Sequence, residues 1–288
     1  LFATLVIRGD FPERFRDVLV YRWLLSAVAA ALMPTGFHSR GVLILQGPQS
    51  IGKTTWFQRL VSHPLLQDAA ILTAHHLDVT DKDSRVTGIS HWIVEIGEFE
   101  STLNRKKDTG RLKGFITNNS DKLRRVWDKR DSHYPRKTVF CASVNDEHFL
   151  IDATGNTRWW VIPVDSVDYE HDIDMQQVFA QLKVDFDRGE RWWLTSEEEA
   201  ELERRNRQHR AVSAIEQHVL DVMDPELPQH EWSRKTPIEV LRIAGIKQPA
   251  NWQCKDCAAV LRDLYGEPTK IKGHLKYHVP IRRFEHSV

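Results

Sequence analysis

A glycine-rich segment near the start of the chain has the composition of a phosphate-binding loop. Residues 47–54 read Gly-Pro-Gln-Ser-Ile-Gly-Lys-Thr and fit G-x-x-x-x-G-K-[ST] without a mismatch. Glycines let backbone N–H groups converge on phosphate oxygens, Lys53 can reach the β- and γ-phosphates, and the Thr54 hydroxyl can ligate Mg²⁺. We therefore expect ATP and Mg²⁺ as cofactors, with the nucleotide bound by Gly47, Pro48, Gln49, Ser50, Ile51, Gly52, Lys53, Thr54 and Thr55.

Hydrolysis also needs a carboxylate at the end of a neighbouring strand, to hold Mg²⁺ or polarise water. Residues 92–98 read Trp-Ile-Val-Glu-Ile-Gly-Glu, with Glu95 inside a predicted strand and Glu98 at its end. In a regular strand these two side chains point to opposite faces. We expect Glu98 to face the phosphates, as catalytic carboxylate and metal ligand, with Glu95 as the second candidate ligand. The alternative is a pair of solvated carboxylates at the edge of a sheet.

Two further polar residues sit where predicted strands begin or end. Asn145 follows the apolar run 138–144, where a sheet would meet the γ-phosphate, although an asparagine that caps a turn explains it equally simply. Arg158 precedes the predicted strand 159–164, and an arginine there can neutralise transition-state charge. The alternative role for Arg158 is a surface ion pair with Asp152 or Asp165. Together with Lys53 and Glu98, Asn145 and Arg158 complete the predicted catalytic set.

The ordered series of these segments resembles the virulence-associated E family. The segments are GPQSIGKTT, HWIVEIGEFE, YPRKTVFCASVN and TGNTRWWVIPV, and the resemblance covers about residues 15–165. The family consists of P-loop proteins of phages, plasmids and genomic islands, is akin to the superfamily 3 helicases, and is often fused to an upstream primase domain. The resemblance implies an AAA+-like ATPase that assembles into a homo-oligomeric ring, which we expect to be hexameric.

The resemblance also implies roles for individual residues. Lys53 and Thr54 would belong to the phosphate loop, and Glu98 to the metal-binding strand. Asn145 would be the sensor of the γ-phosphate. Arg158 would be the finger that reaches the nucleotide of a neighbouring subunit.

The elements that must position these residues alternate between helices and buried strands. Residues 14–33 have helical spacing, and a helix is expected from Lys53 to about residue 61. The strand before the loop is predicted at 42–46, and further strands at 92–96, 138–144 and 159–164. Apolar strands separated by longer connections are typical of an α/β domain with a mostly parallel sheet.

The pattern changes after residue 165. A long polar helix is predicted over 196–223, capped by Ser196, and residues 224–228 break it. Helices at 237–244 and 250–265 and a hairpin at 269–280 follow, which is a winged-helix outline. The predicted domains are an N-terminal helical segment (1–40), an AAA+-like P-loop ATPase core (41–195), a linker helix (196–228) and a winged-helix-like domain (229–288).

The charge of the chain cancels in total but not locally. Its 40 Lys and Arg balance 40 Asp and Glu, whereas residues 105–137 carry twelve bases against four acids. Bases interleaved with aromatic side chains can hold a nucleic-acid backbone and stack on its bases. We expect DNA as partner, single-stranded in a channel and duplex at the C-terminal hairpin, through Lys129, Arg130, His133, Lys270 and Lys272. A solvated helix face, or a protein-docking wing, is the alternative.

The cysteines and histidines near the C-terminus fit a zinc-finger pattern only in part, so we expect no zinc, with a zinc site as the alternative. Cys254-x-x-Cys257 and His274-x-x-x-His278 are close to zinc-finger spacing, but the gap of sixteen residues exceeds the usual 12–15. The cysteines fall on a predicted helix and the histidines on a hairpin, whereas a zinc finger places its histidines on a helix.

Localisation is predicted from what the sequence lacks. The longest apolar run has eleven residues, against about 20 for a bilayer span, and three cysteines do not make a disulfide scaffold. We expect no membrane partner and a cytoplasmic location in a bacterial host or phage-infected cell. Because the chain begins with Leu1, we expect that upstream sequence was removed, which leaves room for the primase domain.

These features favour an ATP-dependent DNA helicase or translocase of a mobile genetic element that acts in DNA replication as a ring. The alternative is a nucleotide-switched DNA-binding protein, or a loader or regulator ATPase, that does not unwind DNA. The residues of the ATP site serve both, so they do not separate the two.

Overall fold

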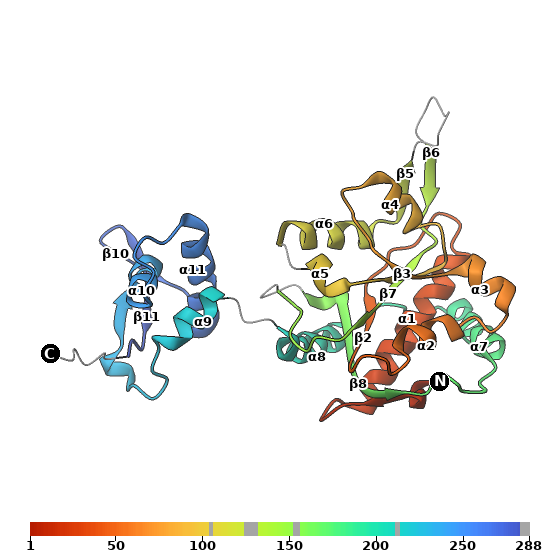
Figure 1. Cartoon of the computed structure of the whole chain (residues 1–288), viewed down its shortest axis with the longest axis horizontal. Helices are drawn as coiled ribbons and strands as arrows, with labels where there is room; N and C mark the ends of the chain where they lie inside the picture. Colours follow the sequence, from red (N-terminus) through yellow and green to blue (C-terminus); the bar gives the residue numbers. More distant parts are fainter. Residues whose placement is uncertain (104–105, 124–131, 152–155, 211–213, 283–288) are drawn as a thin grey trace. The chain divides into compact units, whose positions relative to one another are not determined.

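The chain divides into two compact units, Leu1–Ala211 and Val212–Val288. The computed structural model describes residues 1–288 except 104–105, 124–131, 152–155, 211–213 and 283–288 (Figure 1). Within the described residues, no helix combines the length and the apolar character needed to cross a membrane.

A six-stranded sheet forms the centre of the first unit, in the order β1-β8-β2-β7-β4-β3. β2 pairs in parallel with β7 and β8, β4 pairs in parallel with β7 and β3, and β1 is antiparallel to β8. The unit is therefore mixed α/β with a mostly parallel sheet, as the sequence predicts. The strands are β1 (Leu5–Ile7), β2 (Val42–Gln46), β3 (Ile71–His75), β4 (Ile93–Ile96), β7 (Val139–Val144) and β8 (Trp159–Val167).

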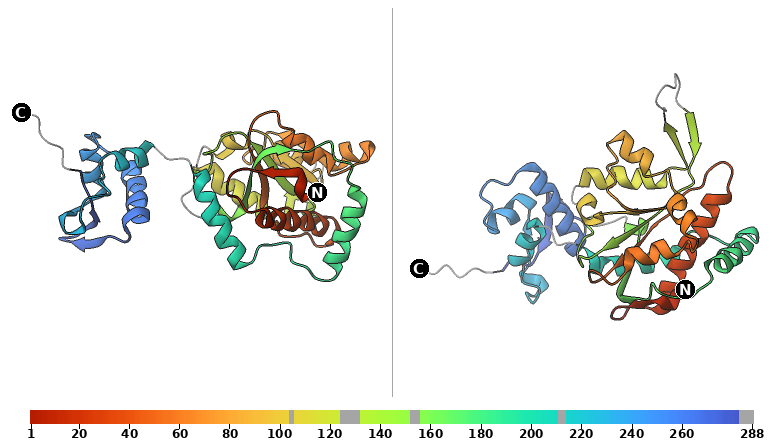
Figure 2. Two further views of the ribbon diagram at one scale, coloured as in Figure 1. Left: turned by 90° about the horizontal axis from the view of Figure 1, so that it is seen from below. Right: turned by 45° about the vertical axis from the view of Figure 1, so that its right-hand side comes forward.

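Helices cover both faces of this sheet, because the inner strands carry apolar side chains on both faces. Leu43 and Leu45 of β2 pack in one cluster, and Val42 and Ile44 pack in the other. The first cluster includes α1 (Glu13–Leu32), α2 (Lys53–Arg59) and α7 (Met175–Asp187), and the second includes α5 (Phe99–Leu103) and α6 (Lys106–Thr117). Figure 2 shows these layers from two further sides. Further helical pieces of this unit are η1 (Phe2–Thr4), α3 (Pro64–Ala70), α4 (Lys82–Thr87) and η2 (Asn156–Arg158), and its last helices, between residues 196 and 209, are described below.

A two-stranded hairpin projects from this unit (Figure 1). It consists of β5 (Ser120–Leu123) and β6 (Ser132–Pro135), paired antiparallel. Its base is fixed by Arg136, which is 2% exposed and donates to both carboxylate oxygens of Asp121 at 2.6 and 2.7 Å. The guanidinium also lies over the ring of Phe115, 4.6 Å from its centre. The buried ion pair thus closes the base of the hairpin, and the contact with Phe115 joins this base to α6.

Replacing Arg136 with methionine is expected to destabilise the first unit by about 3–5 kcal/mol, because the Asp121 carboxylate would stay buried without a partner. Urea unfolding followed by tryptophan fluorescence measures the change. The double variant Arg136→Met/Asp121→Leu removes both charges and is expected to lose less than the single variant. An equal or larger loss in the double variant would contradict this view of the pair.

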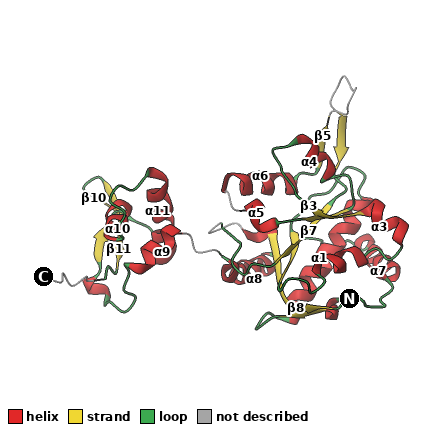
Figure 3. Ribbon diagram, in the orientation of Figure 1, coloured by secondary structure: helices red, strands yellow, loops and turns green. Residues whose placement is uncertain are grey.

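The second unit packs three helices against a three-stranded sheet, in the order β10-β11-β9 (Figure 3). Its core includes Val219, Leu241, Cys257, Leu261 and Val279, all fully buried. Lys272 and Gly273 join β10 to β11, both with positive φ, which suits a tight hairpin turn. The elements are α9 (Ala214–Asp221), η4 (Gln229–Glu231), β9 (Ser233–Lys235), α10 (Pro237–Ile243), α11 (Asn251–Tyr265), β10 (Thr269–Ile271) and β11 (His274–Val279).

The long helix predicted over 196–223 is wrong. The structure instead has α8 (Ser196–Asn206), η3 (Arg207–His209) and the separate helix α9. The chain leaves α8 because Leu150 N–H donates to the carbonyl of His209 at 2.9 Å, which holds this stretch against the first unit. The predicted linker 196–228 is thereby divided, since the first unit extends to Ala211.

The N-cap of α8 also differs by one residue from the prediction. Thr195, not Ser196, is the cap, and its hydroxyl accepts from the N–H of Glu198 at 3.3 Å. The Glu198 carboxylate accepts from the N–H of Thr195 at 2.8 Å. This reciprocal pair satisfies two N–H groups that a helix start leaves open.

Candidate functional site

The segment between β2 and α2 forms a tight loop at the carboxyl edge of the sheet. At Gly47 a side chain would meet the carbonyl oxygen of Val164 at 2.2 Å, so a glycine is needed there. Gly52 precedes α2 with a φ of 89°, a left-handed conformation that favours glycine. The two glycines of the motif are therefore needed for different reasons, Gly47 for close packing and Gly52 for its backbone conformation.

Lys53 lies under this loop and is 5% exposed. Its ammonium donates to the carbonyls of Gly47 and Pro48 at 2.7 and 2.6 Å, and to Asn145 Oδ1 at 2.9 Å. Burial lowers the pKa of Lys53, and the nearby carboxylates of Glu100 and Glu95 oppose that shift. The cation is thus held where its partners are carbonyl and amide dipoles.

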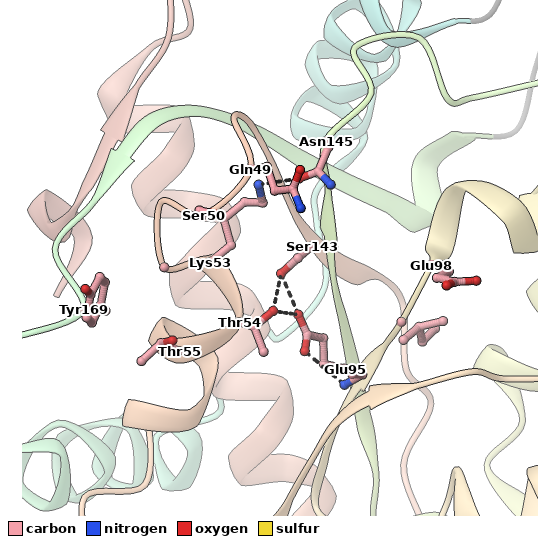
Figure 4. Close-up of a pocket in the computed structure, with 14 residues that line it drawn as sticks. Gln49, Ser50, Lys53, Thr54, Thr55, Glu95, Glu98, Ser143, Asn145 and Tyr169 are labelled. Atoms are coloured by element: carbon pink, nitrogen blue, oxygen red, sulfur yellow. Dashed lines mark hydrogen bonds between the residues drawn. The ribbon is translucent and has the colours of Figure 1, made fainter.

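Thr54 meets a buried carboxylate from a different strand. Its hydroxyl donates to Glu95 Oε1 at 2.7 Å, and the hydroxyl of Ser143 on β7 donates to the same oxygen at 2.6 Å (Figure 4). The backbone N–H of Ala74 donates to Glu95 Oε2 at 3.2 Å. Glu95 is 2% exposed, so three polar groups from three elements stabilise its charge in place of water.

Glu98 occupies a different position from the one that strand alternation predicts. β4 ends at Ile96, and Glu98 has a φ of 48°, so the strand rule no longer applies to it. Both carboxylates consequently line the same cavity, but Glu95 contacts Thr54 and Glu98 does not. Glu98 is exposed and lies on the far side of the cavity from the loop (Figure 4).

The cavity has a volume of about 480 Å³, within the range of small-molecule sites. Of the nine residues predicted to bind ATP, it is lined by Gln49, Ser50, Gly52, Lys53, Thr54 and Thr55. Glu95, Glu98 and Asn145 join them, together with Ser143 and Tyr169, which the sequence did not single out. Ser143 stands two residues before Asn145 in an otherwise apolar run, a period-2 signal that could have identified it.

Asn145 follows β7 at the same edge. Its side-chain oxygen accepts from Lys53, and its backbone N–H donates to Glu100 Oε1 at 2.8 Å. The asparagine therefore faces the loop, and Glu100 fixes its backbone.

Arg158 does not line the cavity. It lies in η2, just before β8, and Trp159 pairs with Val42 at the start of β2. Because β2 and β8 are parallel, Arg158 sits at the amino end of the strands, opposite the loop that follows Gln46. Its Nε is buried, and no hydrogen-bond partner for it exists in the described part of the chain. Asp165 pairs instead with Arg8 at 2.7 Å, and Asp152 lies outside the described residues.

The predicted DNA contacts fall on several places. Lys129 and Arg130 lie outside the described residues. His133 is exposed on β6 and is paired in register with Lys122 of β5. Lys270 and Lys272 are exposed on the β10–β11 hairpin, with Lys272 in its turn.

The residues with zinc-like spacing lie on α11 and β11. Cys257 is fully buried in the core of the second unit and directs its thiol to the carbonyl of Pro237 at 3.7 Å. His278 contacts the carbonyl of Trp232 through Nε2 at 3.3 Å. Across the described ranges, no cluster of three His, Cys, Asp or Glu side chains could hold a metal ion.

The cysteines are expected to differ in reactivity. Burial raises the pKa of the Cys257 thiol to about 12 and that of Cys141 well above its usual value. Because the thiolate is the nucleophile, iodoacetamide at pH 8 should modify the half-buried Cys254 first, and mass spectrometry identifies the modified site. In urea all three should react alike, and equal rates for Cys254 and Cys257 in the native chain would contradict the burial argument.

Comparison with known proteins gives one family. The model of the virulence-associated protein E-like domain matches residues 10–211, which is most of the first unit. No curated protein matches this chain in sequence. Three structures of the NrS-1 C-terminal region are similar at 12–14% identity, with TM-scores of 0.40–0.43. These matches cover 97–98% of this chain and 78% of theirs, and are too distant to carry conclusions about it.

Proposed function

Because the chain belongs to the virulence-associated protein E-like family, we propose that its first unit is a Mg²⁺-dependent ATPase that drives movement on DNA in the replication of a mobile genetic element. The observation that carries this proposal is the pair of contacts from adjacent residues of the loop. Lys53 meets Asn145, and Thr54 meets Glu95. An ammonium, a hydroxyl, a carboxylate and an amide in one cavity are groups that recur in phosphoryl-transfer sites.

The order of the strands supports an AAA+-like arrangement. β7 lies between β2 and β4, so Asn145 at its end has the loop on one side and the carboxylate strand on the other. A group in this place can contact the γ-phosphate while Lys53 and Glu95 hold the rest of the site. Asn145 is accordingly the sensor in this proposal.

The donors fit a hard cation. Mg²⁺ is usually bound by one or two carboxylates together with substrate phosphates, and it prefers oxygen ligands. Thr54 and Glu95 supply such oxygens in contact with each other, and Glu98 lines the same cavity. When bound, Mg²⁺ would neutralise charge that develops on the phosphates. Glu95 would hold the ion with Thr54, Lys53 would bind the phosphates, and Glu98 would orient the attacking water.

The position of Arg158 supports a ring. At the amino edge of the strands it is remote from its own cavity, and its buried Nε has no partner in the residues that the structure describes. In a closed head-to-tail assembly the edge of one subunit meets the nucleotide of the next. Arg158 would then complete the site of a neighbour, and a hexamer is the ring that we propose.

Arg158→Ala is expected to lower ATP turnover by about 10³-fold or more while leaving ATP affinity within a few fold, since a finger acts on the transition state. Steady-state hydrolysis and equilibrium binding of a fluorescent ATP analogue measure the two effects. Mixing Arg158→Ala with Lys53→Ala subunits should restore part of the activity, because some interfaces then pair an intact loop with an intact arginine. A large loss of affinity, or no restoration, would speak against the role.

DNA contacts are proposed for both units. The β5–β6 hairpin belongs to the stretch 105–137, in which Lys and Arg outnumber Asp and Glu. Such a hairpin can hold single-stranded DNA through the negative charges of its phosphates. In the second unit the order α9, β9, α10, α11, β10 and β11 supports a winged-helix-like domain. Lys270 and Lys272 on its hairpin would contact duplex DNA.

DNA-stimulated ATP hydrolysis, measured beside strand displacement on a forked duplex, tests the proposal. We expect both activities, and expect Lys53→Ala to lack both. Hydrolysis stimulated by DNA without displacement would favour the nucleotide-switched DNA-binding or loader function. Absence of ATP binding by the folded chain would overturn the proposal.

A further inference from the structure

An aromatic ring lies against the phosphate loop from outside the motif. Tyr169 follows β8, more than a hundred residues after the loop, and is half-buried. A side chain added at Gly52 would lie 2.0 Å from Cδ1 of Tyr169, so the ring is packed directly on this glycine. Among the described residues that line the cavity, Tyr169 alone is aromatic.

The segment that carries Tyr169 is fixed on both sides. The N–H of Asp168 donates to the carbonyl of Thr4 at 2.8 Å, and Arg59 of α2 donates to the carbonyl of His171 at 3.3 Å. The ring also packs against the main apolar cluster of the unit. The position of the ring is thus set before any ligand arrives, which lowers the entropy lost on binding.

The cavity has two chemically different ends. Lys53, Thr54, Glu95 and Asn145 gather at one end, where charge and hydrogen-bond partners suit phosphates. Tyr169 lies at the other end, on the side of Thr55 and away from Glu98 (Figure 4). A triphosphate that lies along the loop with its terminal phosphate near Lys53 would place its nucleoside toward Tyr169.

We propose that Tyr169 is the platform on which the base of the bound nucleotide stacks, an inference that rests on the proposed nucleotide site. Every base has a π-face, so a single stacking ring favours nucleotides over bare polyphosphates without distinguishing strongly between bases. The ring, rather than the hydroxyl, supplies this preference. Tyr169 is thus a determinant of substrate class, whereas Lys53 and Thr54 recognise the phosphates.

Isothermal titration calorimetry with Mg²⁺ and either ATP or inorganic tripolyphosphate tests this, without DNA. For Tyr169→Leu we expect the Kd of ATP to rise about tenfold to a hundredfold, the range of one base–aromatic stack. The Kd of tripolyphosphate should change less than twofold, because this probe has no base. Tyr169→Phe should bind both as the wild type does. Trp252→Leu, a change of an exposed aromatic residue in the second unit, is the matched control and should also leave both Kd values unchanged.

Two results would overturn the inference. An equal loss for ATP and tripolyphosphate would show that Tyr169 acts by shaping the loop through Gly52, and unchanged ATP binding would show that the base lies elsewhere. Thermal unfolding verifies that each variant is folded, and Tyr169→Met, whose long flexible side chain has no ring, replaces Tyr169→Leu where the latter does not fold. Failure of the wild type to bind either probe would instead refute the proposed nucleotide site itself.

Discussion

Lys53→Ala is expected to remove ATP turnover, with a loss of about 10²–10³-fold or more, since one preorganised donor at the transferring phosphate has an effect of that size. Lys53 is buried beneath the loop, and its ammonium already lies beside Asn145, where the terminal phosphate is proposed to bind. Alanine would leave the carbonyls of Gly47 and Pro48 without their donor and the phosphates without a cation. Steady-state hydrolysis with and without single-stranded DNA measures the loss.

Two controls make this result interpretable. Lys183→Ala changes an exposed lysine of α7 that pairs with Asp187, and it should hydrolyse ATP at the wild-type rate. Lys53→Arg keeps the charge but replaces a compact ammonium with a larger planar group, so it should not restore turnover. Full activity of a folded Lys53→Ala variant would mean that the loop does not bind the reacting phosphates.

The second large effect separates the two carboxylates. Glu95→Gln is expected to lower turnover by about 10²–10³-fold and to raise the Mg²⁺ concentration needed for half-maximal activity, because the amide can replace the hydrogen bonds but not the charge that holds a cation. Glu98→Gln should lower turnover without that change in the Mg²⁺ requirement, since Glu98 does not contact Thr54. Hydrolysis measured across a Mg²⁺ titration distinguishes them.

The reverse outcome would support the assignment of Glu98 drawn from the sequence. If Glu98→Gln shifted the Mg²⁺ requirement and Glu95→Gln did not, Glu98 would be the metal ligand. Glutamine is close in size to glutamate, so a buried Glu95→Gln variant should still fold, and its thermal unfolding verifies this before the kinetics are compared.

The sequence predicted the inner strands of the sheet and missed its edges. β2, β7 and β8 are apolar on both faces, which makes a continuous run that is readable without neighbours. β1 and β3 are edge strands, and in β3 only Ile71 is buried, so no run marks it. The helix over 196–223 was predicted from its polarity and from a cap at Ser196, and the backbone contact of His209 with Leu150 comes from distant sequence that neither signal reveals.

The candidate site was predictable as far as the motif extends. The loop residues follow from spacing, and Asn145 from its place after an apolar run. The preference for Glu98 over Glu95 assumed a regular strand through residue 98. In the structure the strand ends at Ile96, and Glu98 has a left-handed backbone conformation. Tyr169 has no local signal at all, because only the fold brings the segment after β8 to Gly52.

Arg158 and the phosphate loop lie at opposite edges of one sheet, and this separation makes activity depend on the concentration of the protein. If each active site combines the phosphate loop of one subunit with Arg158 of its neighbour, a single isolated subunit does not hydrolyse ATP. Specific activity should then collapse on dilution and recover when copies accumulate, giving a threshold set by abundance. A genetic element that encodes such a protein would begin ATP hydrolysis only after the protein has reached this concentration.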